Sequence, residues 1–371
     1  MPNQSLKYLT QAPSSNFYGA TTWDLKTPSD GWVKADGTPI LQASYPGLYA
    51  QIGLIIDGTI TGTWAAATSG TTSTINATTY GGGLYVYGGS TGKAGTDLPT
   101  LATSTDRITW TQRTALAPQN INAVMYGNGL YLYGGNVGTL AYSNNGTTWT
   151  AATSGTTSAI NDIIYGDKYV YAGVGGVLAT STNAIAWTAR TSGTASNINA
   201  LLYDGTRYYL GGVGGVYRTS TDAITWTTGT SGTTANINSM LYSGSTYVMV
   251  GSNGTIRTSA DGLTWTARTS GTTSVLLDVT YAYGVYMACG AGGLILASFD
   301  DAVTWVTMTS GTTSQLNTIV SDGINAFAAG GVGGVLRYAT SYTYNPSLYF
   351  ITPVGAGLLT DLPSYIYLKG K

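Results

Sequence analysis

The chain is poor in charge, and it lacks residue types on which many enzymes depend. Its 371 residues include 15 Lys and Arg, 16 acidic residues that are all Asp, and no His. Charged residues make up 8% of the chain, against about 25% in an ordinary soluble domain. These absences exclude zinc sites built on His, Ser-His-Asp triads and proton shuttles that use His.

Other scarcities narrow the class of protein further. The one Cys, Cys289, cannot form an internal disulfide. The basic residues are scattered and balanced by acids, which argues against a nucleic-acid surface. No apolar run reaches the roughly 18 residues of a membrane helix, and the N-terminus lacks the layout of a secretory signal. We therefore expect no nucleic-acid partner, no membrane insertion and no secretory signal.

A repeat organises most of the chain. Seven Trp recur at spacings of 38 to 46 residues: Trp64, Trp110, Trp149, Trp187, Trp226, Trp265 and Trp305. Each copy holds four short segments rich in β-branched and aromatic residues, which in the fourth copy are 198–203, 207–212, 215–220 and 225–231. Four strands per repeat are typical of a β-propeller blade. The sequence therefore predicts an all-β fold with a seven-bladed β-propeller at residues 62–341.

The two ends of the repeat complement each other. The last copy has no Trp-bearing strand after residues 334–339, whereas an extra strand, residues 62–69, precedes the first copy. If that strand completes the seventh blade, the ring closes and two exposed sheet edges disappear. We predict that 62–69 pairs with 334–339.

A short turn rich in Ser and Asp precedes six of these Trp. The segments, such as STDAITW at 220–226, resemble the Asp-box hairpin of sialidase-like propellers. Their acidic or amide side chains are expected to bond backbone N–H groups of the hairpin. These structural Asp-box residues are Asp106, Asn145, Asn183, Asp222, Asp261 and Asp300. Asp-box turns occur in propellers of many functions, so they carry no functional information.

The segments outside the repeat carry a second resemblance. Residues 27–53 contain a G-W-x-x-x-D-G pattern followed by Y-x-x-L-Y-x-x-I-G, with Ala35 where the family has Cys. This pattern is similar to the phage tail-collar module of tail fibres and baseplate proteins. The collar motif residues are Gly31, Trp32, Asp36, Gly37, Tyr45 and Leu48. The resemblance implies a small collar-like β domain, formed by residues 1–61 and 342–371, into which the propeller is inserted.

Catalysis is not expected. Sialidase chemistry uses a Tyr nucleophile activated by Glu, an Asp acid/base and an Arg cluster, and this chain has no Glu. Most repeat-borne Asp are already assigned to turns. We therefore expect a protein that is not an enzyme, with no catalytic residues, no metal and no cofactor.

Two groups of residues are candidates for receptor binding. Six Asn stand twelve residues after a Trp, at the start of the innermost strand of their blades: Asn76, Asn122, Asn161, Asn199, Asn238 and Asn317. They would either form a polar ring at one mouth of the central channel or cap their own blade-to-blade turns; the repetition favours capping. The second group, Lys93 and Asp97, lies in a loop found only in the first copy.

The collar resemblance and the missing catalytic residues together point to a host-attachment protein. The main hypothesis is a bacteriophage tail fibre or baseplate adhesin, located in the virion tail, that binds a host cell-surface receptor, with glycan the expected class. The resemblance also implies contacts with other tail or baseplate proteins and a homo-oligomer, a trimer. The alternative is a structural or assembly-factor propeller that binds protein, since related repeats occur in photosystem assembly factors. A glycan hydrolase is the second alternative.

Overall fold

The chain divides into two compact units, residues 62–342 and residues 1–61 together with 343–371. The computed structural model describes residues 54–56, 61–92, 98–282, 284–323, 327–343 and 349–351. In the smaller unit, β1 (Leu54–Ile56) pairs with β30 (Tyr349–Ile351) in an antiparallel two-stranded sheet. Segments from the two ends of the chain therefore pair with each other. The collar motif lies outside the described residues, and the attachment module stays a prediction.

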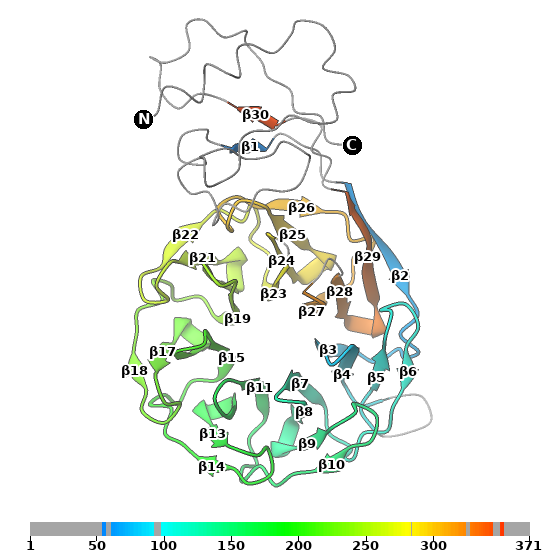
Figure 1. Ribbon diagram of the computed structural model, residues 1–371, viewed down its shortest axis with the longest axis vertical. Helices are drawn as coiled ribbons and strands as arrows, with labels where there is room; N and C mark the ends of the chain where they lie inside the picture. Colours follow the sequence, from blue (N-terminus) through cyan, green and yellow to red (C-terminus); the bar gives the residue numbers. More distant parts are fainter. Residues whose placement is uncertain are drawn as a thin grey trace, which may run out of the picture. The chain divides into compact units, whose positions relative to one another are not determined.

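Residues 62–342 form a seven-bladed all-β propeller, as predicted, in which every blade is a four-stranded antiparallel sheet (Figure 1). The innermost strands are β3 (Ile75–Gly81), β7 (Ile121–Gly127), β11 (Ile160–Tyr165), β15 (Ile198–Tyr203), β19 (Ile237–Tyr242), β23 (Leu276–Ala282) and β27 (Leu316–Ser321). The second strands are β4 (Leu84–Gly89), β8 (Leu130–Gly135), β12 (Tyr169–Gly173), β16 (Tyr208–Gly212), β20 (Tyr247–Gly251), β24 (Val285–Gly290) and β28 (Phe327–Gly331).

The third strands are β5 (Leu101–Ser104), β9 (Leu140–Ser143), β13 (Leu178–Ser181), β17 (Tyr217–Ser220), β21 (Ile256–Ser259), β25 (Ile295–Ser298) and β29 (Leu336–Thr343). The outer strands are β6 (Thr111–Gln112), β10 (Thr150–Ala151), β14 (Thr188–Ala189), β18 (Thr227–Thr228), β22 (Thr266–Arg268), β26 (Val306–Met308) and β2 (Thr61–Ala67). Blades are numbered 1 to 7 from the one that contains β3 to the one that contains β27.

The seventh blade confirms the predicted closure. Its strand order is β2, β29, β28 and β27, so its outer strand comes from the start of the ring and its other three strands from the end. Inner strand β27 also lies beside β3, which joins blade 7 to blade 1. The ring is therefore closed by the polypeptide itself, which leaves no sheet edge between the first and last blades.

Short helical turns that the strand pattern did not predict join the second and third strands of six blades. They are η3 (Asn136–Gly138), η4 (Val174–Gly176), η5 (Val213–Gly215), η6 (Ser252–Gly254), η7 (Ala291–Gly293) and η8 (Val332–Gly334). Glycine makes the turn possible: Gly215 has φ +73°, and a Cβ there would lie 1.9 Å from Thr233 O. None of the described helical segments has the length and apolar character needed to span a membrane. In blade 4 the third and outer strands are also shorter than predicted, because the turn η5 and the link to the next blade take up their ends.

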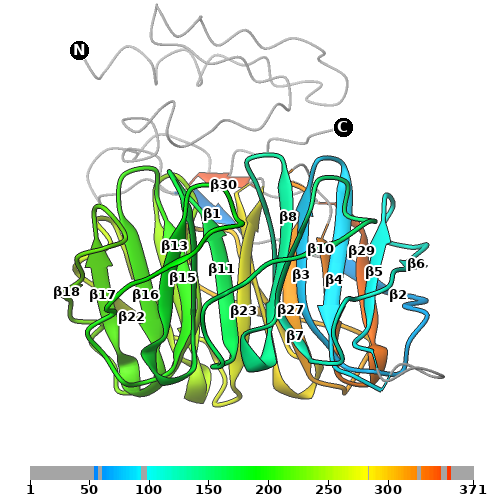
Figure 2. The ribbon, with the colours of Figure 1, turned by 90° about the horizontal axis from the view of Figure 1, so that it is seen from below.

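The antiparallel order gives the ring two different faces, which Figure 2 views edge-on. One face carries the turns η3–η8 and the links from each outer strand to the next inner strand; we call it the turn face. Val174 N donates to Ala159 O over 3.0 Å, which ties η4 to such a link. The opposite face carries the first hairpin of each blade and, in blades 1 to 6, the turn predicted to be an Asp-box. We call it the Asp-box face.

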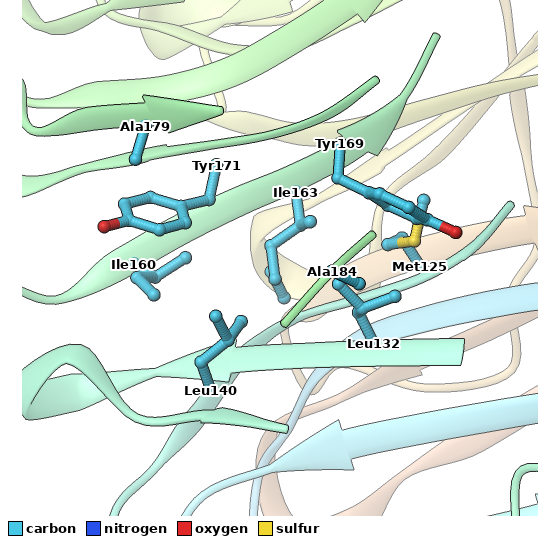
Figure 3. Close-up of a cluster of buried hydrophobic side chains, with 10 residues drawn as sticks. Met125, Leu132, Leu140, Ile160, Ile163, Tyr169, Tyr171, Ala179 and Ala184 are labelled. Atoms are coloured by element: carbon cyan, nitrogen blue, oxygen red, sulfur yellow. The ribbon is translucent and has the colours of Figure 1, made fainter. Parts of the chain in front are cut away.

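The hydrophobic core lies between blades, so every blade depends on its neighbours. One cluster joins Met125, Leu132 and Leu140 of blade 2 to residues of blade 3 that include Ile163 and Tyr171 (Figure 3). Tyr side chains also bridge blades by hydrogen bonds. The hydroxyl of Tyr171 is buried and donates to Ser154 O in the link before its blade, over 2.6 Å. The abundant Tyr are thus mainly packing residues.

Candidate functional site

The six predicted Asn meet at the axis of the ring on the turn face. They line a hollow of about 450 Å³ together with residues that include Leu277, which takes the Asn position in blade 6. We call it the axial hollow. In every inner strand the register with the second strand shifts at this position, for example between Ile160 and Asp162 in blade 3. Such a bulge redirects a side chain, which explains why the Asn lie at the axis instead of in the core between blades.

Each Asn also ties its blade to the next one. The Nδ2 groups donate to backbone carbonyl oxygens at the start of the following inner strand: Asn76 to Ile121 at 2.9 Å, Asn122 to Ile160 at 3.1 Å, Asn161 to Ile198 at 3.0 Å, Asn199 to Ile237 at 3.2 Å, Asn238 to Leu276 at 2.8 Å and Asn317 to Ile75 at 2.8 Å. The prediction that each Asn caps its own turn is therefore wrong. The bulge turns the amide toward the neighbouring blade, where an acceptor is available.

In blade 6, a different donor makes the hydrogen bond to the next inner strand. Leu277 cannot donate to the next blade, and the thiol of Cys289 donates to Leu316 O instead, over 3.4 Å. Cys289 is fully buried on second strand β24, and burial raises the pKa of its thiol well above the usual value. The lone Cys is thus a neutral structural donor, and a buried thiol with a raised pKa is a poor nucleophile.

The Asn ring retains hydrogen-bonding capacity after these bonds are made. An Asn amide offers two N–H donors and one carbonyl acceptor. Among the described residues, no donor reaches the Oδ1 atoms of Asn76, Asn161, Asn199 and Asn238, whereas Gln315 Nε2 donates to Asn317 Oδ1 over 2.7 Å. The axial hollow therefore presents neutral amide donors and acceptors in a fixed arrangement.

Two carboxylates missed by the sequence analysis follow the Asn position on inner strands. Asp162 accepts bonds from Leu201 N at 2.7 Å and from Ile163 N at 2.8 Å, and Asp278 is bonded in the same way by Ile319 N and Val279 N. Desolvation among the inner strands raises the pKa of Asp162 to about 7, and the charge of Asp278 adds to the rise. The only signal in the sequence was an Asp directly after this position in two of the seven copies.

These carboxylates hold the ring together and do not form a recognisable catalytic or metal centre. Each bridges its own inner strand to the next one through backbone N–H groups. Within the described part of the chain, no three His, Cys, Asp or Glu side chains gather as metal ligands would.

The residues predicted to belong to Asp-box turns lie on the opposite face, where they build turns. In blade 4, Asp222 Oδ1 accepts bonds from Thr225 N and Ile224 N, both at 2.8 Å, and from Ser220 Oγ at 2.9 Å. The bond from Thr225 N is the largest of the effects that lower the pKa of Asp222 to about 2. The same contacts recur at Asp106, Asn145, Asn183 and Asp261, and in part at Asp300.

Other predicted site residues cannot be placed. Lys93 and Asp97 of the irregular loop lie outside the described residues, as do the collar residues Gly31, Trp32, Asp36, Gly37, Tyr45 and Leu48. Their proposed roles in receptor binding and attachment stay predictions.

Comparison with known proteins supports the fold. Residues 104–236 match the family described as "DUF6242 beta propeller domain", which is less than half of the chain. No curated protein sequence matches the chain. Among solved structures, similarity extends to propellers at low sequence identity.

Three solved structures illustrate this similarity. The structure titled "YCF48 bound to D1 peptide" has a TM-score of 0.63 and 16% identity, and the match covers 78% of this chain and 98% of that one. YCF48 from Cyanidioschyzon merolae gives a TM-score of 0.60, 15% identity and coverage of 74% and 98%. The WD40 propeller domain of Doa1 gives 0.58, 10% identity and coverage of 75% and 96%. At these identities the likeness establishes the fold alone.

Proposed function

We propose that this chain is a non-catalytic binding protein whose propeller takes an extended segment of a partner protein at the axial hollow. The observation that carries the proposal is the Asn ring, which keeps free amide acceptors after each side chain has been fixed by a bond to the next blade. A peptide backbone offers matching N–H and C=O groups at regular intervals. The YCF48 structure, whose title names a bound peptide, gives a precedent for a propeller in this role.

The rim of the axial hollow suits such a ligand. Val332 of turn η8 lines the axial hollow and is 41% exposed, and Val174 and Val213, at the same position of the turns η4 and η5, are 38% and 37% exposed on the same face. Exposed apolar side chains around polar groups are typical of protein-binding surfaces. The rim can therefore contact aliphatic side chains while the amides bond the backbone.

Two matched substitutions test the location. Val332 lines the axial hollow and Val303 lies in the Asp-box turn of blade 6, and both are 41% exposed. Peptides selected from a random library against the full chain should lose binding to Val332→Trp, because the indole fills the hollow, and keep binding to Val303→Trp. Retained binding by both variants, or equal loss from both, would refute the axial hollow as the binding site.

A second candidate function is attachment of a phage tail to its host, which the collar motif at residues 31–53 favours. In this case the turn face binds a cell-surface receptor, and the collar-like ends join the protein to a fibre or baseplate. A glycan array distinguishes the two functions. Specific binding of one glycan, without competition from any selected peptide, supports the adhesin. Peptide binding without binding of any glycan supports the protein-binding module.

A further inference from the structure

We propose that the turn face also carries an anion site, with Arg257 and Arg268 of blade 5 as its anchors, which takes the carboxylates of an acidic segment of the partner. This inference rests on the proposed function, because it specifies the chemistry of the peptide bound there. Three observations carry it: the separation of charge between the two faces, the way in which the arginines are held, and a hollow that both of them line.

Among the described residues, basic and acidic side chains are distributed unequally between the two faces. Six arginines lie where the third and outer strands approach the turn face: Arg113, Arg190, Arg218, Arg257, Arg268 and Arg337. Eight Asp occupy first hairpins and Asp-box turns on the other face: Asp106, Asp167, Asp204, Asp222, Asp261, Asp300, Asp301 and Asp322. Only three basic residues accompany those acids, Arg107, Lys168 and Arg207. Within the described part of the propeller, the two faces thus differ in charge, and the turn face attracts anions.

Arg268 is held in one orientation, and neither arginine of blade 5 is neutralised by a described carboxylate. Arg268 Nε donates to Thr258 Oγ1 over 2.8 Å, which fixes the guanidinium and leaves both terminal nitrogens for a ligand. Among the described residues, the one hydrogen bond of the Arg257 side chain is a long one, from Nη1 to Trp265 O at 3.5 Å. Within the described residues, neither guanidinium has a carboxylate partner. A guanidinium held in one orientation favours bidentate bonds to carboxylate.

A hollow of about 740 Å³ receives both side chains. Its other walls include Thr233, Ser270 and Thr272 of the links on either side of blade 5, together with Ile256 and Ala267 of its strands, and no acidic residue lines it. Hydroxyl and backbone groups add donors to the two guanidinium groups. The hollow is therefore suited to an anion that is partly enclosed.

The blade accommodates other residues at the positions of these two arginines. At the position of Arg257, blades 1 to 3 have Ala102, Ala141 and Ala179, and at the position of Arg268, blades 2 and 4 have Ala152 and Gly229. Val174, Val213 and Val332 lie on the same face and favour an acidic peptide with aliphatic side chains over an acidic polysaccharide, which has no aliphatic side chains.

Fluorescein-labelled octaglutamate tests the site by fluorescence anisotropy against the full chain, with octaglutamine as the uncharged control. We expect octaglutamate alone to bind, and its affinity to fall steeply as salt rises from about 20 mM to about 300 mM. The double variant Arg257→Gln/Arg268→Gln should bind about tenfold more weakly. Arg257→Lys/Arg268→Lys keeps both positive charges but cannot make bidentate bonds to a carboxylate. Its affinity for octaglutamate should therefore lie between those of the parent and the Gln variant.

Arg207→Gln is the matched control, because Arg207 is equally half-buried but lies on the Asp-box face. An equal loss in this variant, or no binding of octaglutamate to the parent protein, would overturn the site. Binding of polygalacturonate without octaglutamate would replace the peptide with an acidic glycan and refute the proposal. Octaglutamate binding that depends on both arginines but survives Val332→Trp would support the anion site while counting against the axial hollow as a peptide site.

Discussion

Replacing Asn161 with Leu would copy into blade 3 the residue that blade 6 already carries. Asn161 Nδ2 donates to Ile198 O over 3.0 Å and joins inner strands β11 and β15. Such a bond contributes about 1 kcal/mol net, and an acceptor left without a donor costs about 1–3 kcal/mol when buried. Asn161 is only half-buried, so water compensates in part. We expect the free energy of unfolding to fall by about 1–2 kcal/mol.

Blade 6 also suggests a variant that restores part of this loss. Cys289 stands opposite Asp278 in the register of β23 and β24, and Ala172 stands opposite Asp162 at the same place in blade 3. Adding Ala172→Cys to Asn161→Leu should therefore supply a donor to Ile198 O. A thiol is a weak donor, so we expect recovery of less than half of the loss. Ala172→Cys alone measures the cost of an added sulfur in a packed core.

Urea unfolding, followed by Trp fluorescence, measures these differences from the transition midpoint at constant slope. The double-mutant cycle isolates the coupling between the two positions. A parent-like midpoint for Asn161→Leu would refute the view that the Asn ring stabilises the propeller. If the effects of Asn161→Leu and Ala172→Cys simply add, the transfer of donor function from blade 6 would be refuted.

Three further outcomes follow from the structure. The pKa of Asp162 is raised to about 7, so its contribution to stability is present below the unfolded pKa of about 4 and is lost as pH rises through 7. The free energy of unfolding of Asp162→Asn, measured relative to that of the parent, should therefore be higher at pH 8 than at pH 5. The same difference between variant and parent at both pH values would contradict this. Burial alone would raise the pKa of Asp204, but bonds from the hydroxyls of Tyr209 and Tyr247, both 2.6 Å, outweigh it and lower the pKa. Its contribution is thus present above about pH 4 and is lost as pH falls, and Asp204→Asn should destabilise the protein more at pH 7 than at pH 3 in urea titrations. Deleting residues 61–67 should broaden the thermal transition, because blade 7 would lose its outer strand; an unchanged calorimetric trace would count against closure as a source of cooperativity.

The number of blades and the closure of the ring could be predicted because both are recorded in repeated spacing. The Trp interval fixes the length of one blade, and the extra strand at residues 62–69 can be counted without knowing any contact. The Asp-box turns were also predictable, since Asp222 bonds backbone groups only two and three residues away. Local chemistry of this kind is visible in sequence.

The role of the Asn ring could not be predicted for the opposite reason. Its acceptors lie in the next blade, 37 residues away for Asn161 and 242 for Asn317, and the bulge that redirects the side chain has no sequence mark of its own. Asp162 and Asp278 escaped notice because only two copies carry them, and their pKa depends on crowding by neighbouring strands. Arg218, Arg257 and Arg337 occupy the same third-strand position, but nothing in their spacing marks the hollow that Arg257 lines.

The blades differ in the residue that donates a hydrogen bond to the link before the blade. In blades 1 and 3, a Tyr on the second strand stands opposite an Ala on the third, and the hydroxyl donates to a carbonyl in the preceding link, as Tyr171 does opposite Ala179. In blade 4, Leu210 stands opposite Arg218, whose guanidinium donates to the carbonyl of Gly193 in the same link. A neutral phenol and a cation thus satisfy the same part of the fold. Because packing does not require the cation, the arginines can change the charge of the turn face without changing the blades, and this independence allows one scaffold to present an anion site on part of its ring.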